Sequence, residues 1–479
     1  MSAAPGRALT IGLVLGVSVI ALASLAVVTI APLIPAELGG IERYGWIFSA
    51  NLLATLLGTV WGGAQADRHG PGRAFGLGLV AFVVASALAA LSPTMEVLIA
   101  ARALQGLGGG AIITSIYVVV SQAYPDAGRA RVLALLSSAW VLPALLGPAA
   151  AGLIAEATSW RWVFAALVPF SLAVALLTLP SFGGMRRSAA AVAASGVASA
   201  RERLWSAALL SLAVGVGLWA LSADLRPGVS VSVVLAAAAL VPRTLGRLLP
   251  EGTLRLRPGV GAVIAARGLL FAGFITVEVY LALMLTGVLG LSSALTGLVI
   301  ATGAVVWTTG SWTQARLDAL RSPAHGAGVW ARLGWRRELR VRLGVLGLSA
   351  GIAVQLLALW LALHGASGVA LAVALGGWAL AGLGIGFAHA SASVAAFERA
   401  ELEGVEAGSL SSALQLVDGV AAAIATGVAG ALLASVALEH GTGAGVAAAY
   451  AVGATVTLVS LLAAWRIGAV PPGPTPAAR

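Results

Sequence analysis

Residues 62–73 read Gly-Gly-Ala-Gln-Ala-Asp-Arg-His-Gly-Pro-Gly-Arg, a charged and glycine-rich stretch in an otherwise apolar chain. The stretch separates two apolar runs, at about 44–66 and 74–92. Glycine and proline interrupt helices and permit tight turns, so the pattern predicts two antiparallel helices that meet at a charged corner. The other segments of the chain can be placed relative to this corner.

The composition is that of a membrane protein. Only 10% of the 479 residues are charged and 59% are hydrophobic, whereas a soluble domain is about 25% charged. Many runs exceed the ~18 apolar residues that indicate a transmembrane helix, and the alternating pattern of a barrel strand is absent. The chain has no cysteine, which excludes disulfides and thiol chemistry. We expect an all-α membrane protein.

Fourteen candidate spans can be marked along the chain. They cover residues 8–34, 44–66, 74–92, 95–122, 132–157, 161–181, 204–222, 228–242, 262–287, 294–313, 343–363, 367–391, 408–437 and 445–465. The first run is too long for the core of a signal peptide, so we expect it to be retained. The eighth is the weakest, and a twelve-span arrangement with a re-entrant hairpin at 204–242 is the alternative.

The arginines predict the orientation. If the N-terminus lies in the cytoplasm, most arginines fall on the cytoplasmic side, and only Arg43, Arg161 and Arg226 fall outside. This bias follows the positive-inside rule. We therefore expect a multi-pass protein of the cell membrane with both termini in the cytoplasm. The net charge of +10 is explained by this bias, and we expect no nucleic-acid partner.

Three segments read as connections. Residues 182–203 are rich in Ala, Ser and Gly and predict a linker. Residues 314–342 are rich in Arg, with Trp330 and Trp335, which favours an amphipathic segment on the anionic inner leaflet; a ligand-sensing loop is the alternative. Residues 467–479 are proline-rich, and we expect a disordered tail.

The charged corner resembles a loop of the major facilitator superfamily. That loop joins the second and third spans and has the form Gly-x-x-x-Asp-Arg-x-Gly-(x)-Arg-Arg. The matching residues here are Gly63, Asp67, Arg68, Gly70 and Arg73. The resemblance implies a cytoplasmic gate, in which the acid and the arginines latch the two halves together in the outward-facing state.

Three further stretches resemble elements of the same family, in the same order along the chain. They are Arg102-Ala-Leu-Gln105-Gly106 in the fourth span, the helix-kink element Gly147-Pro148-Ala-Ala-Ala-Gly152 in the fifth, and Trp160-Arg161-Trp162-Val-Phe164 at the start of the sixth. The Gly-Pro element is shared by the family's proton-driven exporters. Together with fourteen spans, it makes the chain similar to the fourteen-helix drug:H⁺ antiporter branch.

This resemblance implies two six-helix bundles with two inserted helices. The domains are then residues 1–181, a linker with the inserted helices at 182–258, and residues 259–466. A weak echo supports related halves, because Gln65-Ala66-Asp67-Arg68 and Gln314-Ala315-Arg316 each follow the second span of a bundle. One departure is that Ala23 stands where this branch usually carries an acid in its first span, which weakens a generic cationic-drug assignment.

Two acids lie well inside apolar spans. They are Glu278, in the span 262–287, and Asp418, in the span 408–437. An ionisable residue within a membrane is costly and is by default a functional candidate. Burial disfavours a charged carboxylate, so either acid could bind a proton. Glu278 shares a helical face with Arg267, Phe271 and Phe274. An acid flanked by aromatic rings suits contact with an amphipathic substrate, and Glu278 is our leading proton-coupling residue.

Arg102 and His389 are the predicted assistants in proton coupling. The competing interpretation of all four residues is structural, as buried side chains that only satisfy hydrogen bonds. The residues predicted to line a substrate cavity are polar or aromatic positions within spans: Asn51, Thr114, Tyr117, Trp140, Tyr280, Trp307, Gln355, Trp378 and Gln415.

These features predict a transporter and exclude catalysis by any recognisable motif. No nucleophile–base set, metal-spaced histidines or phosphate-binding Gly-Lys-Ser/Thr element is present, so we expect no enzyme, no cofactor and a proton gradient as the energy source. The predicted function is proton-coupled export of hydrophobic or amphipathic small molecules by a monomer among membrane lipids. The alternatives are export of lipids or lipid-linked molecules and, less favoured, a non-transporting membrane sensor.

Overall fold

The computed structural model describes residues 7–124, 126–182, 197–223, 225–319 and 337–468. The regular elements among these residues are helices. Thirteen of the helical segments in the described ranges are long and apolar enough to cross a membrane, and Val141–Ala157 is a shorter apolar helix. The predicted all-α membrane fold is confirmed.

The N-terminal half runs from α1 to α8. Its long helices are α1 (Arg7–Ile30), α3 (Trp46–His69), α4 (Pro71–Ala90), α5 (Met95–Ala123), α6 (Asp126–Ser138), α7 (Val141–Ala157) and α8 (Trp160–Phe182). Three short turns, η1 (Ala31–Leu33), α2 (Ile34–Leu38) and η2 (Ile41–Arg43), connect α1 to α3. The end of the molecule where α1 begins is called the inner end below, and the opposite end is called the outer end.

The C-terminal half runs from α12 to α18. Its helices are α12 (Val260–Leu283) with the π-turn η3 (Met284–Val288), α13 (Ser293–Ala319), α15 (Arg337–Leu363), α16 (Ser367–Glu403), α17 (Ala407–His440) and α18 (Thr442–Trp465). Between the halves in sequence lie α10 (Val197–Ser222) and α11 (Pro227–Leu245). Each of these two is long and apolar enough to cross the membrane, which favours two spans over the re-entrant hairpin considered for 204–242.

The charged corner is a tight helix–helix turn, as predicted. The helix α3 ends at His69, Gly70 has φ +89°, and Pro71 opens α4. This backbone conformation is readily available only to glycine, and proline is favoured at the first position of a helix because it has no N–H to satisfy. The chain therefore reverses direction at Gly70 and places Asp67, Arg68 and Arg73 at the inner end.

The fifth predicted span is broken, contrary to the single helix expected at 132–157. The helix α6 ends at Ser138 and α7 begins at Val141. Pro143 explains the break, because a proline ring clashes with the carbonyl group four residues earlier, here that of Ala139. Pro148 is accommodated inside α7. The predicted kink at 147–152 therefore lies within a helix, and the interruption precedes it.

Parts of the predicted connections are helical. The linker predicted at 182–203 includes the start of α10. The loop predicted at 314–342 includes the last residues of α13 and the first residues of α15. The remaining parts of these two predicted connections, at 183–196 and 320–336, lie outside the described residues. The tail predicted from 467 is ordered at its first residue, because Ile467 is fully buried and its carbonyl oxygen accepts a hydrogen bond from Arg342. Residues 469–479 lie outside the described residues. The domain boundaries at 181 and 258 stay a prediction.

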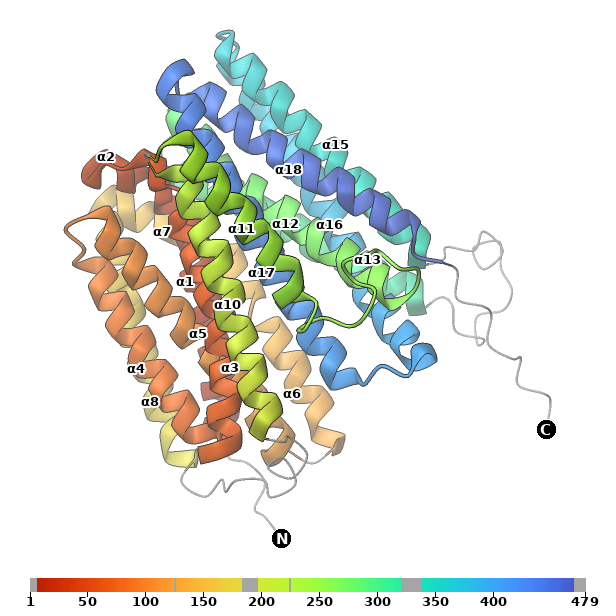
Figure 1. The fold of residues 1–479 in the computed structure, drawn as a ribbon. Helices are drawn as coiled ribbons and strands as arrows, with labels where there is room; N and C mark the ends of the chain where they lie inside the picture. Colours follow the sequence, from red (N-terminus) through yellow and green to blue (C-terminus); the bar gives the residue numbers. More distant parts are fainter. Residues whose placement is uncertain (1–6, 125, 183–196, 224, 320–336, 469–479) are drawn as a thin grey trace.

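The two halves meet at the outer end and splay apart at the inner end. Figure 1 shows α15, α16 and α18 leaning away from α3, α4 and α8 towards the inner end. At the outer end the hydroxyl group of Tyr44 donates to the carbonyl oxygen of Val279 at 3.0 Å, and Ser49 Oγ donates to that of Ala423 at 3.0 Å. A side chain added at Gly45 would lie 2.9 Å from the Cα of Gly430, so the two backbones are in direct contact there.

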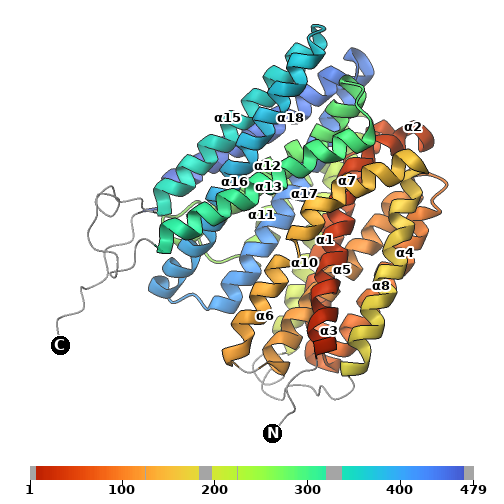
Figure 2. The ribbon, with the colours of Figure 1, turned by 180° about the vertical axis from the view of Figure 1, so that it is seen from behind.

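A second contact between the halves is made by α7 and α13, which run side by side in the rear view (Figure 2). A Cβ at Gly152 would lie 2.2 Å from the carbonyl oxygen of Ser293, and one at Gly297 would lie 2.2 Å from that of Pro148. Only glycine allows so close an approach of two helices. The Gly-Pro element therefore belongs to the contact between the halves.

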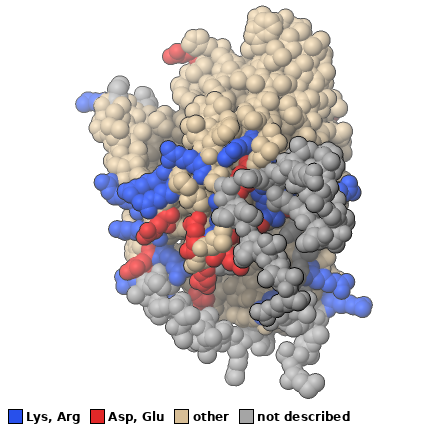
Figure 3. All heavy atoms as spheres, turned by 90° about the vertical axis from the view of Figure 1, so that its right-hand side faces the viewer, with Lys and Arg blue, Asp and Glu red and all other residues tan. Residues whose placement is uncertain are grey.

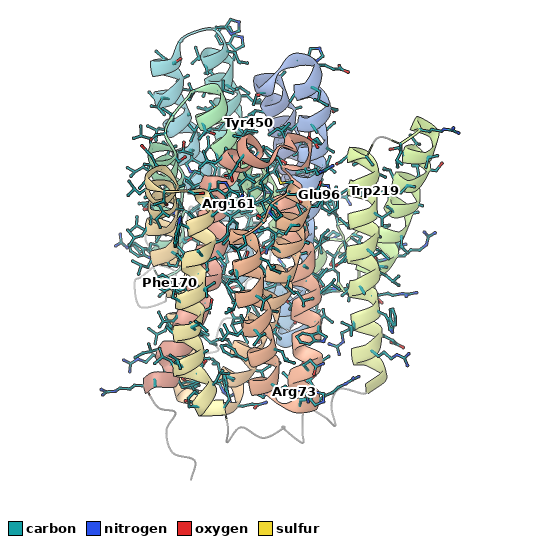
Figure 4. The ribbon with its side chains drawn as sticks, turned by 90° about the vertical axis from the view of Figure 1, so that its left-hand side faces the viewer. Arg73, Glu96, Arg161, Phe170, Trp219 and Tyr450 are labelled. Carbon is teal, nitrogen blue, oxygen red and sulfur yellow. The ribbon has the colours of Figure 1, made fainter. Side chains whose placement is uncertain are left out.

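The inserted pair stands beside the two halves, as Figure 4 shows with Trp219 labelled on α10. The helix α10 packs against α3 of one half and α17 of the other. Ser211 Oγ donates to the carbonyl oxygen of Leu53 at 3.2 Å, and Leu218 fills the space in front of Gly427. The helix α11 packs mainly on α10. The pair thus covers the seam between α3 and α17.

Candidate functional site

The helix α12 carries a stripe of functional candidates along one face. Arg267, Phe271, Phe274 and Glu278 follow one another at spacings of four, three and four residues, which places them on the same side of a helix. The helix is the most buried candidate span, with 83% of its apolar window inside the protein. The stripe therefore faces other helices and not lipid.

Aromatic rings from three helices surround the middle of this stripe. Phe274 stacks on Trp378 of α16 with ring centroids 4.7 Å apart and packs edge-on against Trp307 of α13 at 5.0 Å. Phe271 contacts Trp307 at 6.4 Å and the ring of His389 at 5.8 Å. Such pairs combine a large apolar area with a preferred geometry. They form a rigid aromatic cluster at the heart of the C-terminal half.

Three ionisable side chains meet at the inner end of the stripe. Arg267 Nη2 lies 2.9 Å from Asp418 Oδ2, Arg267 Nε donates to His389 Nε2 at 3.0 Å, and His389 Nε2 lies 3.3 Å from Asp418 Oδ2. These groups come from α12, α16 and α17 and are only 11–18% exposed. The sequence singled out His389 and Asp418 separately, and only the fold joins them.

Arg267 is the residue of this cluster that sequence reasoning did not select. The arginine pattern alone assigns it to the charged inner edge of the span. Its position on the face of Glu278 was the available signal, since an arginine in register with an intramembrane acid needs its own counter-ion. That counter-ion is Asp418 from another helix, and no periodicity in the sequence reports this.

Glu278 lies apart from this cluster. Eleven residues separate it from Arg267, or about 16 Å along the helix axis. The residue is 8% exposed, and its carboxylate makes no hydrogen bond or ion pair with the described residues. Its neighbour on the chain, Tyr280, donates to the carbonyl oxygen of Thr426 at 2.8 Å. The two acids predicted for proton coupling thus occupy different levels of the bundle.

Arg102 is bound within the N-terminal half. Its Nε donates to the carbonyl oxygen of Ile47 at 3.1 Å, and its Nη1 donates to the side chain of Gln105. Asn51 in turn donates to the carbonyl oxygen of Arg102 at 3.0 Å. The side chain therefore links α3 to α5, and within the described residues it has no acidic partner.

The nine residues predicted to line a cavity fall into three groups. Four of them donate hydrogen bonds to backbone carbonyl oxygens: Gln355 to that of Ala374, Trp378 to that of Ile300, Tyr280 to that of Thr426 and Thr114 to that of Gly110. Tyr117, Trp140 and Gln415 are exposed. Trp307 belongs to the aromatic cluster, and Asn51 donates to the carbonyl oxygen of Arg102. The structure brings Trp307 and Trp378 to the stripe of α12 and places the others elsewhere.

In the part of the C-terminal half that the structure describes, no residue pairs with the predicted gate residues. The charge of Arg203 on α10 acts on Asp67. Arg68 and Arg73 are exposed, and Figure 4 shows Arg73 at the inner end. Gly63 lies beside Thr114 of α5, where an added Cβ would be 3.6 Å from its methyl group. The predicted latch between the halves stays a prediction.

A separate hollow of about 390 Å³ opens at the inner end of the C-terminal half. It is lined by Pro250, Glu251, Val260, Glu403, Val405 and Ser409. Figure 3 shows basic and acidic side chains gathered across the middle of the face towards which this half leans. In the described residues no group of three His, Asp or Glu side chains is placed to hold a metal ion.

Comparison with known proteins decides the family. The model of the Major Facilitator Superfamily matches residues 13–426. The chain belongs to this superfamily. A probable multidrug-efflux transporter of Mycobacterium tuberculosis is 26% identical over 434 residues, which cover 87% of this chain and 85% of that protein. Multidrug resistance protein 3 of Bacillus subtilis is 32% identical over 159 residues, 33% of this chain and 31% of that protein.

Solved structures agree with this membership. A crystal structure of a D-xylose–proton symporter superimposes with a TM-score of 0.62 over 96% of this chain and 97% of that one, at 16% identity. A POT family transporter superimposes with a TM-score of 0.66 at 15% identity. At such identities the likeness concerns the fold alone. As a superfamily member with these helices, the protein is a multi-pass membrane transporter.

Proposed function

We propose that this superfamily member is a proton-coupled exporter of hydrophobic or amphipathic small molecules, of the multidrug-efflux type. The relatives that cover most of the chain are named as probable multidrug-efflux transporters, which supports this cargo over lipids, lipid-linked molecules or a sensor role. The protein takes its energy from the proton gradient and acts as a monomer in the cell membrane, with both termini in the cytoplasm.

Transport proceeds by alternating access of the two halves. The two halves are in contact at the outer end, through Tyr44 and Gly152, and their helices lie farther apart at the inner end; we take this arrangement as the inward-facing state. In the opposite state the halves approach at the inner end, and Asp67, Arg68 and Arg73 gain partners there. This rocking about a central site is the general mode of transporters built from two related bundles.

The observation that carries the proposal is the environment of Glu278. Its carboxyl group is buried at one end of the aromatic stripe and has no counter-ion among the described residues. A charged carboxylate in such a place is costly unless a cation or a proton joins it. A proton and an amphipathic substrate at this site are therefore alternative occupants, which is the requirement for exchange of one against the other.

The test is Glu278→Gln in protein reconstituted into liposomes with an imposed pH gradient. We expect pH-driven drug transport to be lost, because the amide cannot exchange a proton, while drug binding and thermal stability are retained. Glu401→Gln, at an exposed acid of α16, is the matched control and should transport like the unmodified protein. Undiminished pH-driven flux in Glu278→Gln would refute the coupling role of this residue.

A further inference from the structure

His389 Nε2 lies between Arg267 and Asp418. It cannot hydrogen-bond to both at once, because the arginine needs an acceptor and the carboxylate needs a donor. In the neutral imidazole this nitrogen is either a donor or an acceptor. Arg267 Nε has a hydrogen atom to donate and lies 3.0 Å away, while Asp418 Oδ2 can only accept and lies 3.3 Å away. The shorter contact requires a lone pair on Nε2. The geometry therefore assigns the proton of neutral His389 to Nδ1.

From this arrangement we propose that Arg267 and a proton compete for His389 Nε2, which makes Arg267 a positioning residue of a proton-binding site formed with Asp418. When a proton binds Nε2, its lone pair is gone and the hydrogen bond from Arg267 Nε breaks. The new Nε2–H donates to Asp418 Oδ2. One proton is taken up, and no other bond is made or broken.

The displaced guanidinium group has an acceptor within the cluster. Asp418 is 9% exposed, and its Oδ1 atom is buried and has no hydrogen-bond partner among the described residues. Such an orphaned oxygen is costly, and a guanidinium group readily binds both oxygens of a carboxylate. Proton uptake thus releases the link between α12 and α16 and strengthens the links of both helices to α17.

The protonation of His389 is governed by the charges of Arg267 and Asp418. Among the described residues the charged groups that act on it are Arg267 of α12 and Asp418 of α17. The helix α13 contributes the ring of Trp307 at 5.8 Å, and Asp318 of α13 and Arg340 of α15 pair with each other. His389 is also the most exposed of the three cluster side chains, at 18%.

The competition of Arg267 and a proton for His389 Nε2 follows from geometry alone, whereas its coupling to export rests on the proposed function. The two are tested separately. Purified protein in lipid nanodiscs, with ring-¹⁵N histidine, reports the protonation of each ring nitrogen by NMR. The chain has five histidines, and a His389→Gln spectrum identifies the resonances of His389. At alkaline pH we expect the Nδ1–H form, and on acidification the doubly protonated ring.

The variant Arg267→Gln removes the competing Nε donor. We expect His389 to lose its preference for the Nδ1–H form in this variant, while Arg247→Gln, at an exposed arginine, leaves the preference unchanged. The unmodified protein alone already tests the proposal if the variant fails to fold. An Nε2–H form at alkaline pH, or an Nδ1–H form that persists in Arg267→Gln, would overturn the competition.

The coupling arm measures pH-driven transport across a range of pH. In Arg267→Gln we expect a loss of about tenfold or more, typical of a broken coupling between two binding events, together with a flattened pH profile. A profile equal to that of the unmodified protein would overturn the coupling role of Arg267. If no variant or unmodified protein shows pH-driven transport, the proposed function fails, and the NMR result still decides the proton site.

Discussion

The inner corners of the two halves are similar in sequence and different in structure. Each follows a Gln-Ala pair, at Gln65 and at Gln314. In the C-terminal corner Asp318 lies 2.7 Å from Arg340 and 3.4 Å from Arg337, and Arg337 also pairs with Glu398. In the N-terminal corner the described residues offer Asp67 no ion pair, and Arg68 and Arg73 are exposed.

This difference indicates that the corners have different roles. The ion pairs of the C-terminal corner join α13, α15 and α16 and leave Arg340 fully buried, so the corner is complete within its own half. The N-terminal corner keeps its charges at the inner end, where the halves are apart. We infer that the C-terminal corner holds its own half together and that the N-terminal corner is available to partners in another state.

The largest effect is expected from Asp318→Asn. The amide breaks the ion pair with the buried guanidinium group of Arg340, and breaking such a pair costs about 3 kcal/mol. Unfolding in detergent, followed by circular dichroism, measures the loss of unfolding free energy. Asp67→Asn is the matched control and should change stability by no more than about 0.5 kcal/mol. Equal losses in both variants would remove the distinction between the corners.

An intermediate effect is expected at the closed outer end. The Cβ of Gly152→Ala would lie 2.2 Å from the carbonyl oxygen of Ser293, so α7 and α13 must move apart at a cost of about 1–3 kcal/mol. We expect the outer end to open and the inner corners to approach, as measured by spin-label distances across each end. Gly419→Ala, at a helical glycine with no atoms within 4 Å of the added carbon, should leave these distances unchanged.

The smallest effect is expected from Asp67→Asn on the conformational equilibrium. If Asp67 latches the halves when the inner end is closed, the amide favours the inward-open state. An exposed ion pair is worth up to about 1 kcal/mol, or a fivefold change in population. Double electron–electron resonance measures this change, and the absence of cysteine leaves only the introduced labels. A matching change in Arg203→Gln would show that the partner of Asp67 is α10 and not the C-terminal half.

Much of the fold could be predicted from the sequence because lipid imposes a length and an apolar composition on each crossing helix. The predicted spans 95–122 and 445–465 agree with α5 and α18 to within a few residues at each end. The errors arose where one side chain decides the outcome. Pro143 breaks the fifth span, and the ion pairs of Asp318 support helical ends where the arginines suggested a loop.

The site was predicted less completely, because burial in a span and pairing between spans are different properties. The apolar surroundings of Glu278 and Asp418 are visible in the sequence, and so is the face that Glu278 shares with Phe274. The contact of Arg267 with His389 joins residues 122 positions apart. No local pattern contains this separation, since it depends on how α12 and α16 pack.

The sequence by itself determined that this protein lies in a membrane, where most of its spans run and the character of the charged corner at 62–73. Hydropathy, helix-breaking residues and turn chemistry act over a few residues, so they can be read along the chain. The tertiary structure alone decided which charges meet and which end is closed. Those properties depend on contacts between distant helices, such as Gly152 with Ser293 and Arg267 with Asp418. The corner that the sequence marks most clearly is thus one for which the described residues provide no ion pair to Asp67.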